Sequence, residues 1–314
     1  MRIISERIAG AMTCVSTRAP NLQDMQKFVD AALGPHPPTQ FITGRITRPL
    51  NDGKSGAHVF ELEGGRVLKL YPARGAGHVH DDFHLKRSLR DIVMTCITPD
   101  AISPHVYEFG VSHDMRPFMV MQKIDGVELF SYAPVGGADD VHLLLNIVQA
   151  LRQFNASFRY FCRFYGLDST IRPCHRDLHP HNIFVTHDGV RFIDFDLAVC
   201  PLAALRDSDS PQRQRALRHP WLQWVLGNYS RSTEEYVHWT NVFDRVPPIV
   251  SSDSDMLQIY AICRYFERRT PGLKAVTVAM QRSADKDDFL RRAHDGLQAL
   301  LVGEVARAPP VSGR

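Results

Sequence analysis

The first regular pattern in the chain is that of an amphipathic helix. Residues 22–33 carry apolar side chains three and four positions apart, which predicts one helical face packed on a core. Asn21 can cap this helix at its start, and the proline-rich run at 35–38 stops it. We expect residues 1–40 to form a helical appendage that precedes the main fold.

Short β-type runs replace the helical pattern over residues 41–122. Turns rich in Gly, Asp and Asn separate these runs. The runs lie at 60–62, 67–71, 106–111 and 117–122. One helical stretch, residues 81–96, interrupts them. Residues 41–122 are therefore expected to form a small, sheet-rich lobe.

Helical spacing returns after residue 125. An apolar stripe within residues 143–161 predicts a long helix that runs toward residue 175. Two alternating runs, 183–185 and 190–194, then flank an Asp-Gly turn. Because Asp-Gly supplies the backbone conformation that tight turns need, this pattern predicts a β-hairpin.

The C-terminal third completes the predicted organisation. Helical patterns recur at 253–266 and at about 285–301. We expect residues 123–305 to form a larger, mainly helical lobe with an inserted segment at about 200–245, followed by a disordered tail at 306–314. A small antiparallel sheet lobe followed by a helical lobe predicts an α+β fold.

Composition restricts the partners and the compartment. The 314 residues are 44% hydrophobic and 23% charged, which is enough apolar material for a sizeable core. A net charge of +3 gives no overall electrostatic case for nucleic acid as a partner. No apolar run approaches the roughly 18 residues that a membrane span needs. The six cysteines lack a CxxC pair, which favours a reducing, cytoplasmic compartment and leaves secretion into a host cell as an effector open.

Three polar residues around the hairpin have the chemistry of a magnesium site. Asp177 and Asn182 lie just before the hairpin, and Asp194 lies at its far end. A two-stranded turn of this length folds Asp194 back beside Asn182. Because Mg²⁺ prefers oxygen ligands, the spacing predicts a magnesium site next to a third carboxylate, Asp177.

The sequence around these residues resembles a known family. HRDLHPHN at 175–182 and IDFD at 193–196 are similar to the catalytic loop and the metal motif of the protein kinase superfamily, whose patterns are HRDxxxxN and DFG. The resemblance implies a bilobal protein-kinase-like fold with ATP as phosphate donor and Mg²⁺ as cofactor. It also implies that Asp177 orients the acceptor hydroxyl, while Asn182 and Asp194 hold Mg²⁺.

Further motifs of this family precede the catalytic loop. VLKLY resembles the strand that carries the phosphate-contacting lysine, so Lys69 is the candidate for the α- and β-phosphates. PFMVMQKIDGVELF resembles the connector between the lobes, which places Met121 as the gatekeeper and Glu128 near the ribose. The backbone of Gln122 and of Ile124 is expected to contact adenine.

The phosphate-covering loop departs from the protein-kinase pattern. Residues 50–60 lack the full GxGxxGxV spacing, but Gly53, Ser55 and Gly56 are small enough to bring backbone N–H groups close to phosphate. The loop is more similar to that of aminoglycoside phosphotransferases and related small-molecule kinases. A Walker A loop is disfavoured because its first glycine position holds Arg48.

The helix expected to supply a glutamate partner for Lys69 contains none. Asp91 is the expected replacement by its place in the stretch, with Asp81 and Asp82 as alternatives. Further along, SSDSDMLQIYAI resembles the start of the buried helix whose aspartate, here Asp255, braces the catalytic loop.

Two more substitutions lie inside the catalytic motifs. Asp196 replaces the glycine of DFG and is expected to add a second metal-facing carboxylate. His179 replaces the lysine of protein serine/threonine kinases, in the style of small-molecule kinases. Transition-metal binding by the histidines of this loop is disfavoured, because the resemblance explains the loop without it.

Three functions remain open from the sequence. A divergent protein serine/threonine kinase is favoured by Arg176, by the connector motif and by the short spacing from Gln122 to Asp177. A small-molecule kinase for an aminoglycoside, choline or sugar is favoured by the phosphate loop, His179 and IDFD. The third is a nucleotide-binding scaffold without turnover. We expect ATP and a hydroxyl-bearing acceptor as partners, with a protein preferred over a small molecule.

Overall fold

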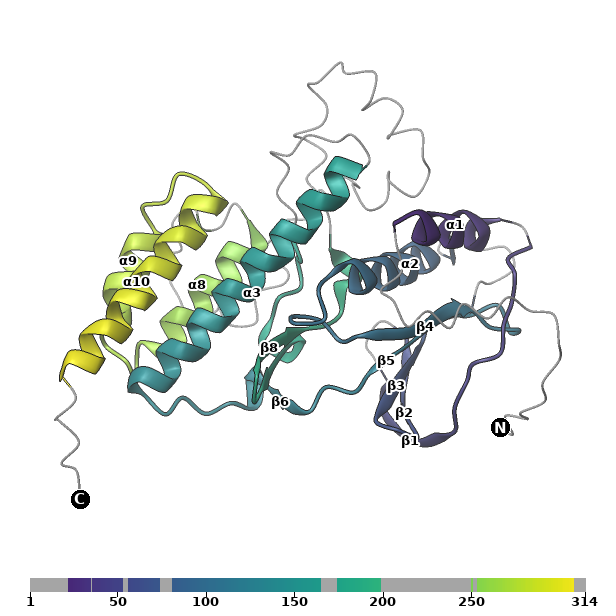
Figure 1. Ribbon diagram of the computed structural model, residues 1–314, viewed down its shortest axis with the longest axis horizontal. Helices are drawn as coiled ribbons and strands as arrows, with labels where there is room; N and C mark the ends of the chain where they lie inside the picture. Colours follow the sequence, from purple (N-terminus) through teal and green to yellow (C-terminus); the bar gives the residue numbers. More distant parts are fainter. Residues whose placement is uncertain are drawn as a thin grey trace, which may run out of the picture.

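The computed structural model describes most of the chain, and Figure 1 shows how its elements are arranged. The described residues are 22–34, 36–52, 56–73, 81–164, 174–198, 250 and 253–307. Some predictions fall outside these ranges. They concern the first 21 residues, the loop residues Gly53 and Ser55, the inserted segment at 200–245 and residues 308–314 of the expected tail.

A five-stranded antiparallel sheet forms the N-terminal part of the fold. Its strands are β1 (Ile46–Asp52), β2 (His58–Leu62), β3 (Arg66–Leu70), β4 (Val106–Val111) and β5 (Pro117–Gln122). They lie in the order β1-β2-β3-β5-β4. The bounds predicted for β4 and β5 are confirmed. Strand β1 was not predicted, because its sequence ITRPLND is mostly polar, as suits an exposed strand at the edge of a sheet.

A second antiparallel sheet contains the predicted hairpin. Its strands are β6 (Gly126–Glu128), β7 (Ile183–Thr186) and β8 (Gly189–Phe192), in that order. Strand β6 can pair with β7 because residue 126 is a glycine. A Cβ atom at this position would lie 2.5 Å from the carbonyl oxygen of Val185. The sheet therefore joins the segment after β5 directly to the hairpin.

Helices make up most of the rest of the described chain. The α-helices are α1 (Leu22–Leu33), α2 (Asp81–Ile97), α3 (Gly137–Phe164), α8 (Ser254–Phe266), α9 (Leu273–Met280) and α10 (Lys286–Arg307). Three short 3₁₀ helices are η1 (Leu129–Ser131), η2 (Pro180–Asn182) and η3 (Phe195–Leu197). The predicted bounds of α1 are confirmed, whereas α9 was not predicted. Helix α10 continues two residues past 305, where the helical lobe was expected to end.

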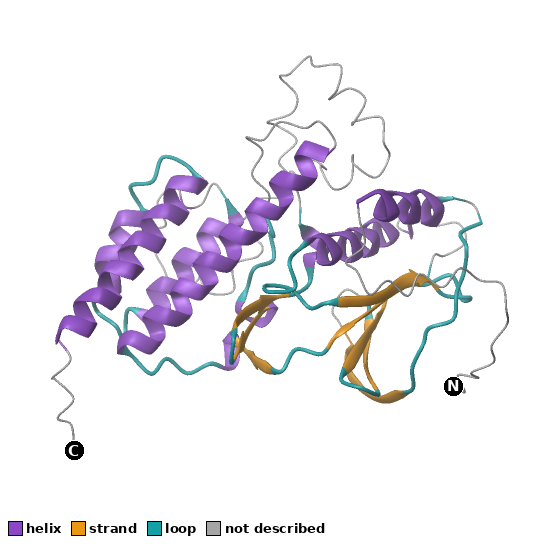
Figure 2. Ribbon diagram, viewed as in Figure 1, coloured by secondary structure: helices purple, strands orange, loops and turns teal. Residues whose placement is uncertain are grey.

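The elements form a mixed α+β fold, which confirms the predicted class. Figures 1 and 2 show α1 and α2 on one side of the five-stranded sheet. Helices α3, α8, α9 and α10 gather at the other end of the molecule, with the three-stranded sheet between. The hairpin and its flanking loops therefore lie where the two groups of elements meet.

Helix α1 packs into the core of the fold. Its Met25 and Val29 are buried in the same apolar cluster as Ile92 of α2. Phe28 packs edge to face on Phe109 of β4, with ring centroids 4.8 Å apart. Fully burying each large apolar side chain contributes about 1.5–3 kcal/mol. The N-terminal helix therefore holds α2 in place from the side away from the helical group.

Candidate functional site

Three carboxylates meet at the ends of the hairpin. One oxygen from each of Asp177, Asp194 and Asp196 lies within 4.8 Å of the others. The hairpin brings them together as the spacing predicts, since the N–H of Ile193 donates to the carbonyl oxygen of Asn182 at 3.1 Å. Like charges this close repel in the absence of a cation, so the cluster needs positive charge nearby.

Asp194 adopts a backbone conformation that few residues adopt. Its φ and ψ are both 63°, in the left-handed region that Asp tolerates better than most side chains. The next residue, Phe195, is fully buried. Its ring packs on His175 at 4.7 Å and on Phe154 at 5.6 Å between centroids. The buried ring therefore holds the turn that aims the Asp194 carboxylate.

Lys69 supplies the positive charge. Its Nζ atom lies 2.6 Å from Asp91 Oδ2 and 2.7 Å from Asp194 Oδ1. Burial lowers the pKa of Lys69, but the carboxylates of Asp194 and Asp91 outweigh burial and raise it above its ordinary value. For Asp194 the two effects have the opposite sign: burial raises its pKa, but the neighbouring Lys69 outweighs burial and lowers it below the ordinary value. Both groups are therefore charged at neutral pH.

Asp91 is held by more donors than Lys69 alone. The Tyr71 hydroxyl donates to Asp91 Oδ2 at 2.7 Å, and the N–H of Phe195 donates to Asp91 Oδ1 at 2.8 Å. The carboxylate is 1% exposed. This network ties α2 to β3 and to the turn at Asp194, which shows how a side chain shorter than glutamate reaches the lysine. Among the described side chains, Asp91 is therefore the partner of Lys69 on α2, as the sequence predicts.

Tyr71 is a site residue that the sequence reasoning did not single out. It lies two residues after Lys69, so both side chains point to the same face of the extended chain. That spacing is the signal that could have identified it. Burial and then the Asp91 charge raise the pKa of Tyr71 well above its ordinary value, so the hydroxyl keeps its proton and remains a donor.

Asp196 faces a different cation. Its Oδ2 atom forms an ion pair with Arg87 of α2, and its carbonyl oxygen accepts from Arg90 Nη1 at 3.2 Å. The other carboxylate atom, Oδ1, is buried and has no hydrogen-bond partner among the described residues. Burial, and then the neighbouring charge of Asp194, raise the pKa of Asp196 to about 7.

The donor set fits a magnesium ion. Asn182 donates through Nδ2 to the carbonyl oxygen of Asp177 at 2.8 Å and to its Oδ2 at 3.2 Å, so its own Oδ1 points the other way. Asp194 and the unpartnered Oδ1 of Asp196 add carboxylate oxygens. Hard oxygen ligands of this kind are those that Mg²⁺ prefers, and no soft ligand is among them.

A brace from α8 fixes the loop that carries Asp177. Asp255 accepts from the backbone N–H of His175 at 2.9 Å and from that of Arg176 at 3.0 Å. Asp253 instead caps α8 and accepts from the N–H of Met256 at 3.0 Å. Asp255, and not Asp253, therefore binds the backbone of this loop, as the sequence predicts.

Lys286 completes this brace. Its Nζ atom lies 2.8 Å from Asp255 Oδ2 and 3.1 Å from Asp253 Oδ2. Its side chain is 4% exposed. Lys286 begins α10, more than 100 residues after the loop, and no sequence pattern indicated this contact. The cation prevents the cluster of Asp253, Asp255 and Cys174 from carrying an uncompensated negative charge.

The connector residues run from the end of β5 to the end of β6. Met121 is partly buried and lies opposite Val67 of β3. The N–H of Gln122 donates to the carbonyl oxygen of His105 at 2.7 Å, and Ile124 follows in the loop before β6. Glu128 lies farther on, and its Oε2 is 2.7 Å from His181 Nδ1. Glu128 thus contacts the loop that carries Asp177.

Gly56 is the part of the expected phosphate loop that the structure describes. It is exposed and has a φ of 77°, a conformation that favours glycine. Gly53 and Ser55 lie outside the described residues. The structure therefore places Gly56 two residues before β2.

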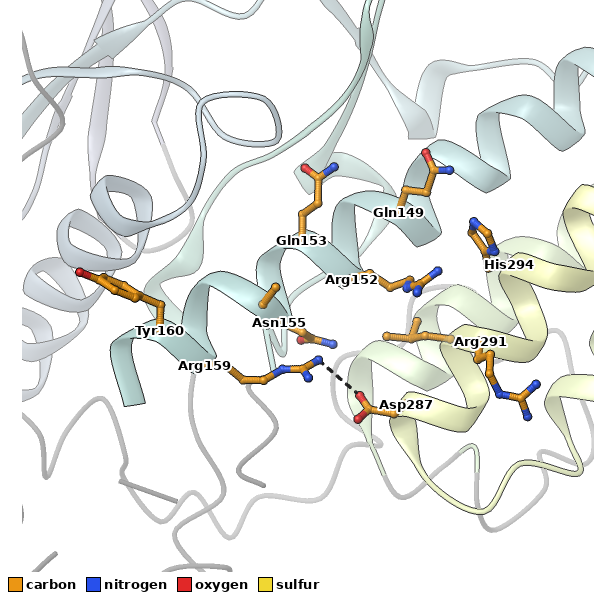
Figure 3. A pocket seen from close by; sticks show the side chains of 11 residues that line it. Gln149, Arg152, Gln153, Asn155, Arg159, Tyr160, Asp287, Arg291 and His294 are labelled. Atoms are coloured by element: carbon orange, nitrogen blue, oxygen red, sulfur yellow. Dashed lines mark ion pairs between the residues drawn. The ribbon is translucent and has the colours of Figure 1, made fainter. Parts of the chain in front are cut away.

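A separate cavity of about 850 Å³ lies between α3 and α10 (Figure 3). Arg152, Asn155 and Arg159 line it from α3, and His294 lines it from α10. Arg159 reaches Asp287 across it at 3.8 Å. None of the predicted site residues lines this cavity, so we do not connect it with the carboxylate cluster.

The chain was also compared with known proteins. No protein-family model matches it, and no curated protein matches its sequence. Within the described part of the chain, no helix combines the length and the apolar character needed to cross a membrane.

Proposed function

We propose that this protein is an ATP- and Mg²⁺-dependent phosphotransferase that moves the γ-phosphate of ATP to a hydroxyl group. The observation that carries the proposal is the contact of Lys69 with both Asp91 and Asp194, beside the carboxylate of Asp177. A buried cation, metal-binding oxygens and a carboxylate for the acceptor proton are the groups that phosphoryl transfer needs. Here they come from segments far apart in the sequence.

Each group has surroundings that suit its role. Lys69 stays charged because two carboxylates raise its pKa, which suits contact with the α- and β-phosphates. Asp177 receives the proton of the acceptor hydroxyl as the new oxygen–phosphorus bond forms. The bond from the γ-phosphorus to the β–γ bridging oxygen breaks in the same transfer, and ADP leaves.

Asn182, Asp194 and Asp196 would hold Mg²⁺. When bound, the ion supplies positive charge to the phosphate oxygens. The protein's own contribution is to fix the ligands. Asn182 is held through its amide by Asp177, and Asp194 through Lys69. Pre-positioned ligands of this kind reduce the reorganisation that binding requires.

The arrangement of elements supports a bilobal protein-kinase-like fold. The five-stranded sheet carries Lys69, the helical group carries the brace at Asp255, and the chain crosses between them after β5. On this basis we place adenine against Met121 and the backbone of Gln122 and Ile124. Glu128, already bonded to His181, would lie near the ribose.

A protein hydroxyl is the acceptor that we propose. Asp255 accepts from the backbone N–H groups of both His175 and Arg176, and a brace of this kind is what the resemblance to protein kinases implies. A small-molecule acceptor is the second candidate, since His179 lies beside Asp177 and Asp196 replaces the glycine of DFG. A scaffold without turnover is less consistent with a site in which each transfer group is present.

Transfer of labelled phosphate tests the proposal. The protein is incubated with γ-labelled ATP, Mg²⁺ and a whole-cell lysate, which is then separated into protein and metabolite fractions. We expect label in protein, whereas label confined to metabolites would replace the first acceptor by the second. ATP binding without transfer to either fraction would favour the scaffold.

Asp177→Asn tests the role of the loop carboxylate. We expect it to reduce transfer at least about 100-fold while Mg·ATP binding, measured by calorimetry, is largely kept. Asp188→Asn is the matched control, because the Asp188 side chain is 48% exposed on the hairpin turn and, in the described contacts, pairs with its neighbours Thr186 and Arg191. Full turnover in Asp177→Asn would refute the assigned role.

A further inference from the structure

His179 adopts one defined tautomer next to Asp177. The backbone N–H of His181 lies 3.2 Å from His179 Nδ1. A backbone N–H can only donate, so Nδ1 is the acceptor and carries no proton. In the neutral ring the proton is then on Nε2, and this atom lies 3.6 Å from Asp177 Oδ1. The ring therefore presents an N–H group to the proposed catalytic carboxylate.

The loop holds this ring firmly on both sides. His179 is the N-cap of η2, whose first residue is the buried Pro180, and Leu178 before it is fully buried. The backbone N–H of His181 fixes the tautomer of His179. The His181 ring stacks on Phe130, with ring centroids 4.0 Å apart, and its Nδ1 contacts the Glu128 carboxylate. The side chains of His179 and Asp177 are only 17% and 16% exposed, so water competes weakly for their contact.

We propose that His179 is a positioning residue for Asp177, an inference that rests on the proposed function. Asn182 donates to Oδ2 of Asp177 at 3.2 Å, and His179 Nε2 faces Oδ1. Because the two oxygens have different partners, rotation of the carboxylate is restricted. Each oxygen keeps a further lone pair, and the fixed orientation leaves one of these to accept the proton of the acceptor hydroxyl. The 3.6 Å separation is longer than a hydrogen bond, and contacts of this kind shorten when substrates bind.

Two substitutions separate positioning from simple capping of the turn. In His179→Asn, the short amide can still accept from the N–H of His181 but does not extend to Asp177. In His179→Gln, the longer amide places an N–H group where Nε2 was, and the cap is lost. His179→Asn therefore retains the cap alone, and His179→Gln retains the N–H group directed at Asp177 alone.

Steady-state kinetics of the two variants provide the test. We expect His179→Gln to keep kcat within about threefold of the wild type and His179→Asn to lose about tenfold or more, with the KM for ATP unchanged in both. The thermal midpoint is measured in parallel. The opposite result would be loss of activity in His179→Gln and its retention in His179→Asn, with the lower thermal midpoint in His179→Gln. In that case His179 is only a cap, and the proposal is overturned.

Nitrogen NMR of the histidine rings tests the contact without turnover. Wild-type protein should show His179 protonated at Nε2 and not at Nδ1, and Asp177→Asn should shift the Nε2 signal. A ring protonated at Nδ1, or a signal unchanged by Asp177→Asn, would overturn this inference alone. Absence of phosphate transfer in the wild type, with the expected NMR result, would instead overturn the proposed function.

Discussion

Tyr71 and Asp91 are joined by a 2.7 Å hydrogen bond in the middle of the site. The phenol donates to the same carboxylate oxygen that binds Lys69, while the other oxygen accepts from the backbone of Phe195. An aspartate is one methylene shorter than the glutamate expected from the resemblance. The tyrosine and the backbone N–H compensate by fixing the carboxylate from two further directions.

Tyr71→Phe should therefore weaken both the fold and ATP binding. Removing the hydroxyl deletes a buried hydrogen bond to a charged group, which costs about 1.5–3 kcal/mol in the free energy of unfolding. The KM for ATP should rise, because Asp91 holds Lys69 less firmly. Urea unfolding and steady-state kinetics measure the two effects. Tyr107→Phe, at a residue 41% exposed on β4, is the control and should change stability by less than about 0.5 kcal/mol.

Lys69→Met should be more damaging than loss of a surface lysine. It leaves Asp91 and Asp194 without their shared cation, and removing one partner of a buried ion pair costs about 3–5 kcal/mol. Phosphate transfer should fall below detection. Lys123→Met is the matched control, because its ion pair with Glu61 is 38% exposed on the lysine side. Equal loss of stability in both variants would contradict the central place given to Lys69.

The raised pKa of Asp196 predicts a dependence of stability on pH. A carboxyl with an ordinary value of 3.8 that rises to about 7 on folding binds a proton in the folded state when the unfolded state has lost it. Its contribution to stability is therefore full below about pH 4 and is lost as pH rises toward 7.

Unfolding of metal-free protein and of Asp196→Asn, measured at a series of pH values, tests this dependence. Relative to the variant, the wild type should lose up to about 1.4 kcal/mol per pH unit between these limits. Added Mg²⁺ should reduce the loss, because the ion favours the charged carboxylate. If the free energy of unfolding changes equally with pH in the wild type and in Asp196→Asn, Asp196 does not titrate in this window.

Gly126→Ala should break the pairing of β6 with β7. The added Cβ would lie 2.5 Å from the Val185 carbonyl oxygen, so one strand must shift. We expect a stability loss of about 1–3 kcal/mol, as for other overpacked positions, together with lower transfer because Glu128 is the last residue of β6. Gly303→Ala in α10 is the control: nothing lies within 4 Å of its Cβ, and alanine should stabilise the helix by up to about 1 kcal/mol.

Much of the fold follows from local patterns in the sequence. The bounds of α1, β4 and β5 agree with the predictions, because periodic apolar residues and clear breakers define them. Strand β6 was missed since three residues are too short for any period to appear. Edge strand β1 was missed because exposure removes the apolar alternation on which the prediction relies.

The site was predictable only where its residues belong to one contiguous motif. Asp177, Asn182 and Asp194 come together because a hairpin of fixed length joins them. Arg87 and Lys286 contact aspartates more than 30 positions away, where no local spacing relates the partners. Their places depend on how α2 and α10 pack, and packing of distant elements leaves no periodic signal.

Helix α2 concentrates the connections of the site on one short segment. Arg87, Arg90 and Asp91 bind Asp196, Lys69 and the backbone of Phe195, so a small rotation of the helix would release all of them together. Because α1 packs on α2, a substitution that loosens α1 is expected to disturb the carboxylate cluster as well, although α1 contributes no residue to it.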